Sequence, residues 1–303
     1  MKASLKNFMT GLIDYAGLFP PASLDIQTVL DNYTAYLERE EGWMLGRCVL
    51  PASQLYRVAS HAGFRCSVIV SPAVSQEELD QLQNFSSMEG HVEMVETRFP
   101  ENSNSPDRCS EHLLQLHSKF GQAGLQDIQL FVETKNVADA ALAIATFNNS
   151  RSGGEVISNV GYKLRCGGLE KQAFPSPEKV AKVIGICRER DIPIKFTAGM
   201  HLPLRNYSAG IEVMQHGFIN IFGAALLCWG CNLSPEEIAE CLCEDTAHHF
   251  HFMDGSFSWK DKMISSSELK RLRQSKVISF GCCSFTEPVE GLRSLGFLDS
   301  IGA

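Results

Sequence analysis

The chain has no long apolar run and no excess of positive charge, and both absences narrow what it can do. Its longest apolar stretch, at residues 218 to 229, is too short and too broken by glycine to span a bilayer, so no membrane partner is expected. The net charge is −8 and no basic stripe with interleaved aromatics appears, so nucleic acid is not an expected partner either. The N-terminus shows no cleavage-site pattern, and we expect no signal peptide.

A disulfide framework is also missing, although cysteine is plentiful. The eleven cysteines are odd in number and scattered, and several, such as Cys48 and Cys66, stand inside apolar strand patterns. Such a pattern is typical of reduced, buried thiols and predicts a cytoplasmic location. The cysteines between residues 228 and 243 are too irregularly spaced for a standard zinc site. We therefore expect neither a metal nor a cofactor.

What the sequence does contain is a regular alternation of strand-like and helix-like segments. Strand-like runs are expected at residues 13–19, 44–50, 65–71, 91–99, 128–135, 160–168, 193–201 and 217–223. Most are continuously apolar, as strands covered on both faces should be. Eight strand-then-helix units predict an α/β fold of the (β/α)8 TIM-barrel type. A doubly wound open sheet is the alternative, and it is less favoured because no glycine-rich phosphate fingerprint follows the first strand.

The remaining residues are expected to form an extension of the barrel. On this count residues 1–231 make the barrel, and residues 232–303 make a mostly helical C-terminal extension packed on it. A short helix is also expected at 209–215. Appendages over the catalytic face of a barrel often exclude water, so residues between His248 and Phe285 are expected near its mouth. The alternative, favoured equally, is that these residues lie at the opposite end of the barrel or in an oligomer interface.

Two of the expected strands each carry one lysine and then break into a glycine turn. They read VGYKLRCGG, with Lys163, and PIKFTAGMH, with Lys195. An ammonium group inside an apolar strand needs a partner or a lowered pKa. Two such lysines close together would lower each other's pKa by repulsion, which makes an amine nucleophilic. Two lysines at strand ends, each paired with a nearby carboxylate, are the alternative interpretation.

The order of motifs along the chain resembles the class I deoxyribose-phosphate aldolase family. The segments that carry the resemblance are, in order, LIDYAGLFPPASLDIQTVL, RCVLPASQLYRVAS, VEMVETRF, LFVETK, GYKLRCGG, IKFTAGMH and FINIFGAA. The resemblance implies that Lys163 forms an imine with the substrate, that Lys195 lowers the pKa of Lys163, and that Glu93 relays protons. The family has an aspartate where this chain has Glu93, and paired glycines where Gly199 stands alone.

Further residues are expected to contact the substrate because they lie at the ends of strands, where the active sites of such barrels are found. Strand carboxylates are available at Asp14, Glu93, Glu96 and Glu133. Arg165 can clamp a carboxylate or phosphate, and His201 is placed for acid–base work. The expected set of substrate contacts is Asp14, Glu133, Arg165, Gly167, Gly168, Thr197, Gly199, His201 and Gly223.

These features favour an aldolase-type lyase that acts on a small carbonyl compound, phosphorylated or carboxylated, through a lysine Schiff base. The small-molecule substrate is the only expected partner, and the sequence leaves a homo-oligomer open. The alternative is a diverged barrel that binds a small anion without cleaving carbon–carbon bonds, as the departures from the family pattern suggest. Metal-dependent hydrolysis through His201 is less favoured, because no paired metal-ligand motif ends a strand.

Overall fold

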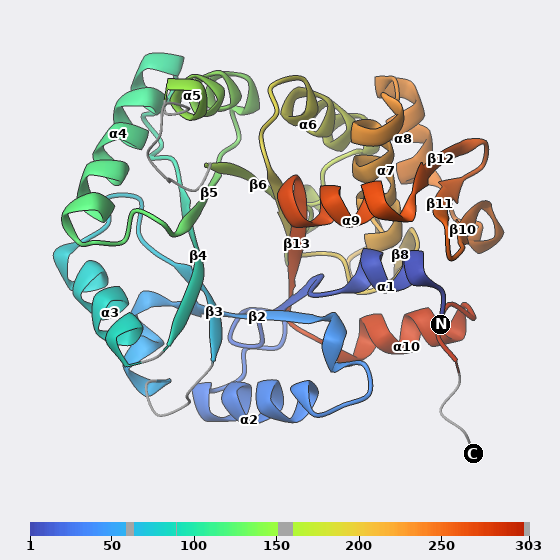
Figure 1. Cartoon of the computed structure of the whole chain (residues 1–303), viewed down its shortest axis with the longest axis horizontal. Helices are drawn as coiled ribbons and strands as arrows, with labels where there is room; N and C mark the ends of the chain where they lie inside the picture. Colours follow the sequence, from blue (N-terminus) through green and yellow to red (C-terminus); the bar gives the residue numbers. More distant parts are fainter. Residues whose placement is uncertain (59–63, 89, 151–159, 300–303) are drawn as a thin grey trace.

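Eight parallel strands close into a barrel in the computed structural model, which describes residues 1–58, 64–88, 90–150 and 160–299 (Figure 1). Around the barrel the strand order is β1-β13-β7-β6-β5-β4-β3-β2. The strands are β1 (Ile13–Tyr15), β2 (Leu45–Pro51), β3 (Arg65–Ile69), β4 (His91–Arg98), β5 (Gln129–Glu133), β6 (Gly161–Arg165), β7 (Ile194–Thr197) and β13 (Val277–Cys282). The predicted (β/α)8 TIM barrel is confirmed.

Helices surround the barrel and bury the outward faces of the strands (Figure 1). They are α1 (Ala3–Met9), α2 (Ile26–Leu37), α3 (Gln76–Ser87), α4 (Pro106–Gln122), α5 (Val137–Ser150), α6 (Pro177–Glu189), α7 (Phe218–Cys231), α8 (Pro235–Cys243), α9 (Ser266–Ser275) and α10 (Thr286–Ser294). Short 3-10 turns lie at Gly42–Met44, Ala52–Arg57, Lys171–Ala173 and Ala247–His249. Local sequence sets several helix starts: Ser75 and Glu78 form a capping box at α3, which satisfies backbone groups that the helix leaves unpaired.

The eighth strand is not where the sequence predicted it. Residues 217–223 were expected to form a strand, but they begin α7, in which every residue from 218 to 228 is buried. A short run that is apolar on all sides does not by itself distinguish a buried strand from a buried helix. Phe222 of this helix packs on Phe196 of β7 and Phe280 of β13, with ring centroids 5.2 and 5.8 Å apart. The closing strand is β13, so the boundary at residue 231 was wrong as the end of the barrel.

A long insertion between β7 and β13 replaces the expected separate extension. It begins with an antiparallel hairpin, β8 (Asn206–Ser208) and β9 (Val213–Gln215), where a helix had been predicted at 209–215. It continues through α7 and α8 to a small antiparallel sheet and then α9. The strands of that sheet are β10 (Phe250–Phe252), β11 (Ser256–Trp259) and β12 (Lys262–Ser265).

The small sheet packs on helices outside the barrel, at the right-hand edge of Figure 1. Phe8 of α1 lies against Phe252 and Phe257, with ring centroids 5.3 and 5.2 Å apart. The prediction that this part of the tail covers the mouth was therefore wrong for residues 250–265. It holds for residues 283–285, which directly follow the carboxyl end of β13.

The amino end of the barrel is closed by a buried guanidinium. Arg273 of α9 donates from Nε to the Phe8 carbonyl at 2.8 Å and from Nη2 to the Thr10 carbonyl at 3.2 Å. Its Nη1 donates to the carbonyls of Val277 and Ile278, where β13 begins. One side chain therefore joins α1, α9 and β13 and satisfies carbonyls that burial would otherwise leave unpaired.

Candidate functional site

The two strand lysines lie side by side inside the barrel. Lys163 of β6 and Lys195 of β7 are partners in the register of the two strands, and they are only 6% and 0% exposed. Both ammonium groups reach the same carboxylate: Lys163 Nζ lies 2.8 Å from Glu96 Oε2, and Lys195 Nζ lies 3.0 Å from Glu96 Oε1. Tertiary structure thus brings the predicted pair together, with an acid of β4 between them.

Lys195 is the more enclosed of the two lysines. Besides Glu96, its ammonium group contacts the Asp14 carboxylate, lies 3.3 Å from Ser279 Oγ and lies 3.2 Å from Met94 Sδ. Ser279 Oγ also donates to Asp14 Oδ2 at 2.6 Å. Partners on several strands fix this ammonium group in place, so Lys195 acts as a fixed positive charge rather than as a reachable amine.

Lys163 is the lysine of the pair that contacts a residue at the carboxyl end of a strand, and the active sites of such barrels are found at those ends. Its Nζ lies 3.4 Å from Glu133 Oε2, and Glu133 Oε1 accepts from Arg165 Nε at 3.0 Å. Glu133 and Arg165 are the last residues of β5 and β6, and their side chains are 25% and 50% exposed. The network therefore opens to solvent through Glu133 and Arg165, and Lys163 is the amine nearest that opening.

Glu93 is not the acid of this site. Its carboxylate pairs with Arg47 Nε at 2.8 Å and with Arg65 Nη1 at 3.8 Å, near the amino ends of the strands. The register of β3 and β4 shifts by one residue at positions 92 to 94, and such a bulge changes which side chains share a face. The expected proton relay at Glu93 was therefore wrong in position, and Glu96 stands between the lysines instead.

The charges of the cluster hold Lys163 protonated. Burial alone would lower the pKa of Lys163, but the carboxylates of Glu96 and Glu133 outweigh it and raise that pKa above its usual value. Against the cost of burial, Lys163 and Lys195 hold the pKa of Glu96 well below its usual range. The expected lowering of the pKa of Lys163 was therefore wrong, because the carboxylates of Glu96 and Glu133 raise that pKa instead.

Several of the other predicted substrate contacts gather at the carboxyl ends of β6 and β7. The loops after these strands approach closely: a Cβ on Gly167 would lie 2.5 Å from the Cα of Gly199. Gly199 has a φ of +73°, which a residue with a side chain rarely adopts. Gly168 lies in the first of these loops, and Thr197 ends β7. Glycine is thus needed here for packing of one loop on the other.

Gly223 does not belong to the site. It lies within α7, where an added Cβ would meet the Phe257 ring at 3.2 Å, and it faces the small sheet rather than the barrel mouth. The prediction was wrong because it depended on the mistaken eighth strand.

A second group of reactive side chains lies on the loops after β7 and β13, and the sequence did not reveal it. His201 contacts the Glu287 carboxylate through Nδ1, and Cys283 Sγ lies 3.7 Å from its Nε2. These partners are 86 and 82 residues from His201 in the chain. No local spacing connects them, and only the neighbouring positions of β7 and β13 in the barrel bring them together.

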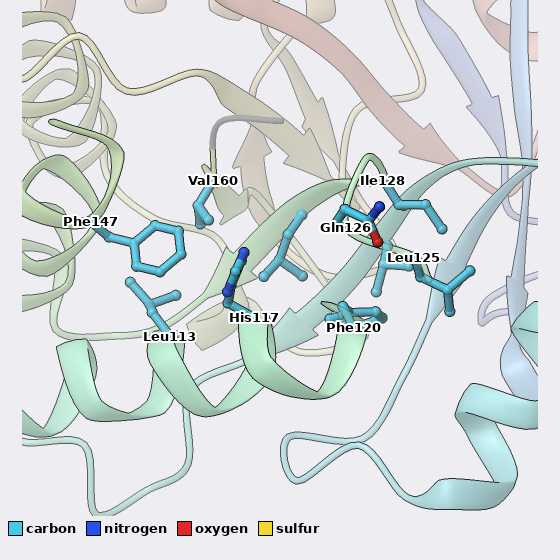
Figure 2. A pocket seen from close by; sticks show the side chains of 10 residues that line it. Leu113, His117, Phe120, Leu125, Gln126, Ile128, Phe147 and Val160 are labelled. Atoms are coloured by element: carbon cyan, nitrogen blue, oxygen red, sulfur yellow. The ribbon is translucent and has the colours of Figure 1, made fainter. Parts of the chain in front are cut away.

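The cavity in Figure 2 is mostly apolar, unlike the charged group of Asp14, Glu96, Glu133, Lys163, Arg165 and Lys195, which we call the lysine cluster. It lies between α4, α5 and strands β4 and β5, and apolar side chains such as Leu113 and Phe147 line most of it. None of the lysine-cluster residues lines it. Among the described residues, no group of three or more His, Cys, Asp or Glu side chains could hold a metal ion.

Comparison of the chain with protein-family models, with curated proteins and with solved structures finds no match. Within the part of the chain that the structure describes, no helix is long and apolar enough to cross a membrane.

Proposed function

We propose that the protein is an aldolase-type lyase that forms a Schiff base between Lys163 and a small carbonyl substrate. The supporting observation is the convergence of Lys163 and Lys195 on Glu96 at distances of 2.8 and 3.0 Å. Two cations around one carboxylate, inside a barrel and near the carboxyl ends of its strands, supply a nucleophilic amine, a proton carrier and a fixed charge.

Lys163 carries the covalent chemistry in this proposal because it is nearest the opening. As a neutral amine, its nitrogen attacks the carbonyl carbon, and the carbinolamine then loses water to give the imine. Glu96 lies within hydrogen-bonding distance of Lys163 Nζ and can carry protons to and from the reacting atoms. Lys195 keeps Glu96 oriented and ionised between turnovers.

Because the pKa of Lys163 is raised, the proposal also specifies the charge of the substrate. Arg165 is half exposed and pairs with Glu133, which also pairs with Lys163. An anionic group on the substrate would compete for Arg165 and draw Glu133 away from Lys163. Losing that carboxylate would lower the pKa of Lys163 and free the amine for attack. A phosphorylated or carboxylated carbonyl compound therefore suits this site better than a neutral one.

Borohydride trapping tests the proposal. The protein is incubated with a panel of small aldehydes and ketones, with and without a carboxylate or phosphate, and is reduced and mapped by mass spectrometry. We expect a reduced adduct on Lys163, formed fastest with an anionic carbonyl compound and lost in Lys163→Met. Lys179 of α6 is exposed and lies outside the cluster, so Lys179→Met is the matched control and should leave the adduct unchanged. No adduct on Lys163 across the panel would contradict the proposal.

A barrel that binds a small anion without imine chemistry is the second candidate, and the protonated state of Lys163 favours it. In that case an unreactive dicarboxylate or inorganic phosphate raises the melting temperature, and Lys163→Met leaves most of that rise intact. Arg165→Met should abolish it, because this half-exposed guanidinium is the cation nearest solvent. Stabilisation by anions in the absence of any trapped adduct would favour this candidate over the lyase.

A further inference from the structure

The loops at the carboxyl ends of β7 and β13 assemble a thiol, an imidazole and a carboxylate. Cys283 Sγ lies 3.7 Å from Nε2 of His201, and the Glu287 carboxylate contacts Nδ1 of the same ring. Each ring nitrogen therefore has one partner, a nucleophile on one side and an orienting acid on the other. This is the arrangement by which a histidine activates a neighbouring thiol.

The backbone around these residues holds them in place. Ala198 and Gly199, with φ values of +63° and +73°, turn the chain directly after β7 and lead it to His201. Ser284 Oγ accepts from the Glu287 backbone N–H at 3.2 Å, which fixes Glu287 in the first turn of α10. Helix α10 also packs closely on the loop that follows β7, since a Cβ on Gly291 of α10 would lie 2.5 Å from Pro203 Cδ.

Two features place positive charge near the Cys283 sulfur atom. The hydrogen bond to Cys283, together with that to Glu287, raises the pKa of His201 to about 9 against the opposing effect of burial. The imidazole is therefore mostly cationic at neutral pH beside the sulfur atom. Cys283 also precedes the start of α10 by three residues, and the positive end of a helix stabilises a thiolate. The thiol is partly exposed, so a reagent can reach it.

A second histidine–glutamate pair shows what is particular about the first. His249 Nδ1 lies 2.7 Å from Glu244 Oε2, but the other partners of that carboxylate are Lys260, the Trp259 ring N–H and the Thr246 backbone N–H. It lies on the small sheet, outside the barrel, as a surface ion-pair cluster. Of these two pairs, the one at His201 also faces a thiol and lies at the carboxyl ends of barrel strands.

We infer that Cys283 is a nucleophile that His201 activates and Glu287 orients, and that it accepts an acyl group from a small activated ester or thioester. The Cys283 sulfur attacks the acyl carbon, so a carbon–sulfur bond forms and the bond to the leaving group breaks. His201 gives its proton to the leaving group. Water then attacks the acyl-enzyme and gives a proton to His201, and the carbon–sulfur bond breaks, which releases the carboxylic acid and restores the thiolate.

This site is independent of the imine chemistry proposed for Lys163. The two share the carboxyl ends of β6, β7 and β13, but they share no residue. Failure of either proposal therefore leaves the other standing, and Lys163→Met should not alter the reactivity of Cys283.

The first experiment measures alkylation of individual cysteines in the intact protein by iodoacetamide, followed by peptide mapping. Cys243 is exposed and serves as an internal reference thiol. At about pH 6 an ordinary thiol is almost fully protonated, and we expect Cys283 to react at least about tenfold faster than Cys243. The titratable neighbours that bear on this comparison are His201, Glu287, Tyr15 and Cys282. Equal rates with the same pH slope at both cysteines would overturn the inference without any substitution.

The second experiment tests acyl transfer with p-nitrophenyl acetate. We expect a rapid release of nitrophenol together with an acetyl group on Cys283, both lost in Cys283→Ser and strongly slowed in His201→Gln. His249→Gln is the matched control, and its rate should equal that of the wild type. Fast alkylation without an acetyl adduct would overturn the acyl-transfer assignment. An unchanged rate in folded His201→Gln would overturn the role of the histidine.

Discussion

The two ends of the barrel use charge in opposite ways. At the amino end, Arg273 is surrounded by backbone carbonyls, and Glu93 is held between Arg47 and Arg65. At the carboxyl end, Glu133, Arg165 and His201 remain partly exposed, and Cys283 lies beside His201 on the loop that follows β13. Arg273 is only 6% exposed and gives its donors to backbone carbonyls, which leaves no room for a ligand, whereas the pair of Glu133 and Arg165 has partners that a ligand can displace. Charge therefore stabilises one end and is available for chemistry at the other.

One chain of contacts joins the two ends through the centre of the barrel. It runs from Arg65 through Glu93, Arg47, Asp14, Lys195, Glu96, Lys163 and Glu133 to Arg165. Exposure rises along its second half, from none at Lys195 to half at Arg165. We therefore expect substitutions near the amino end to change mainly the stability of the protein, and substitutions near the carboxyl end to change mainly its reactivity.

The largest expected effect on stability is at the amino end, in Arg273→Met. Removing the guanidinium leaves the carbonyls of Phe8 in α1, of Thr10 and of the start of β13 without their donor, which should cost on the order of 5 kcal/mol. Urea unfolding measures the loss. Arg271→Met is the matched control, because Arg271 pairs with Glu268 at the surface and should cost little. Equal stabilities of the two variants would show that Arg273 does not close the barrel.

A smaller loss is expected at the centre, in Lys195→Met. Asp14 and Glu96 then lose their shared cation while buried, which should cost about 3–4 kcal/mol at neutral pH. In the wild type both carboxyl pKa values are lowered, so their contribution is present above the unfolded values of 3.8 and 4.5 and is lost as the pH falls further. The variant's deficit should therefore shrink as the pH falls below 4.5, as urea unfolding at several pH values can show. Lys163→Met should cost less, because Lys195 still pairs with Glu96.

The next expected effect is on reactivity, in Glu133→Gln compared with Glu93→Gln. Glu133 raises the pKa of Lys163, so its removal should increase the rate of borohydride-trapped adduct with a neutral aldehyde at pH 7 by about tenfold. Glu93 contacts neither lysine in the described network, and its substitution should leave that rate unchanged. Equal rates in the two variants would contradict the prediction that charges at the carboxyl end, and not those at the amino end, control the reactivity of Lys163.

The smallest expected effect is on the pH dependence of stability at His201. Its pKa is raised from 6.5 to about 9 in the folded protein, so its contribution is fully present below pH 6.5 and is lost as the pH rises through 9. Because Glu287 is more than half exposed, the difference should stay below about 1 kcal/mol. Urea midpoints of the wild type and His201→Gln should differ at pH 6 and converge near pH 10. A constant difference would mean that packing, not charge, holds the loop.

Much of the fold could be predicted from the sequence because most barrel strands share one pattern, a short continuous apolar run. Seven of the eight barrel strands lie where continuous apolar runs predicted them, and the capping box at Ser75 and Glu78 marks the start of α3 as expected. The exception, residues 217–223, begins a buried run in α7, and continuous burial is the same for a core strand and a core helix. Only the length of that run, which exceeds the length of the barrel strands, indicated a helix. Periodicity carried no information there.

The sequence by itself predicted one lysine at the same point of each of two neighbouring strands, because both lysines follow apolar residues and precede a glycine turn. The register of β6 and β7 confirms that Lys163 and Lys195 are neighbours. Tertiary structure decided which acid meets them, since a one-residue bulge in β4 turns Glu96 inward and leaves Glu93 among arginines. It also decided that Lys163 stays protonated and that Cys283 faces His201. A pKa and a contact between residues 82 positions apart depend on the positions of neighbouring strands, which no local pattern specifies.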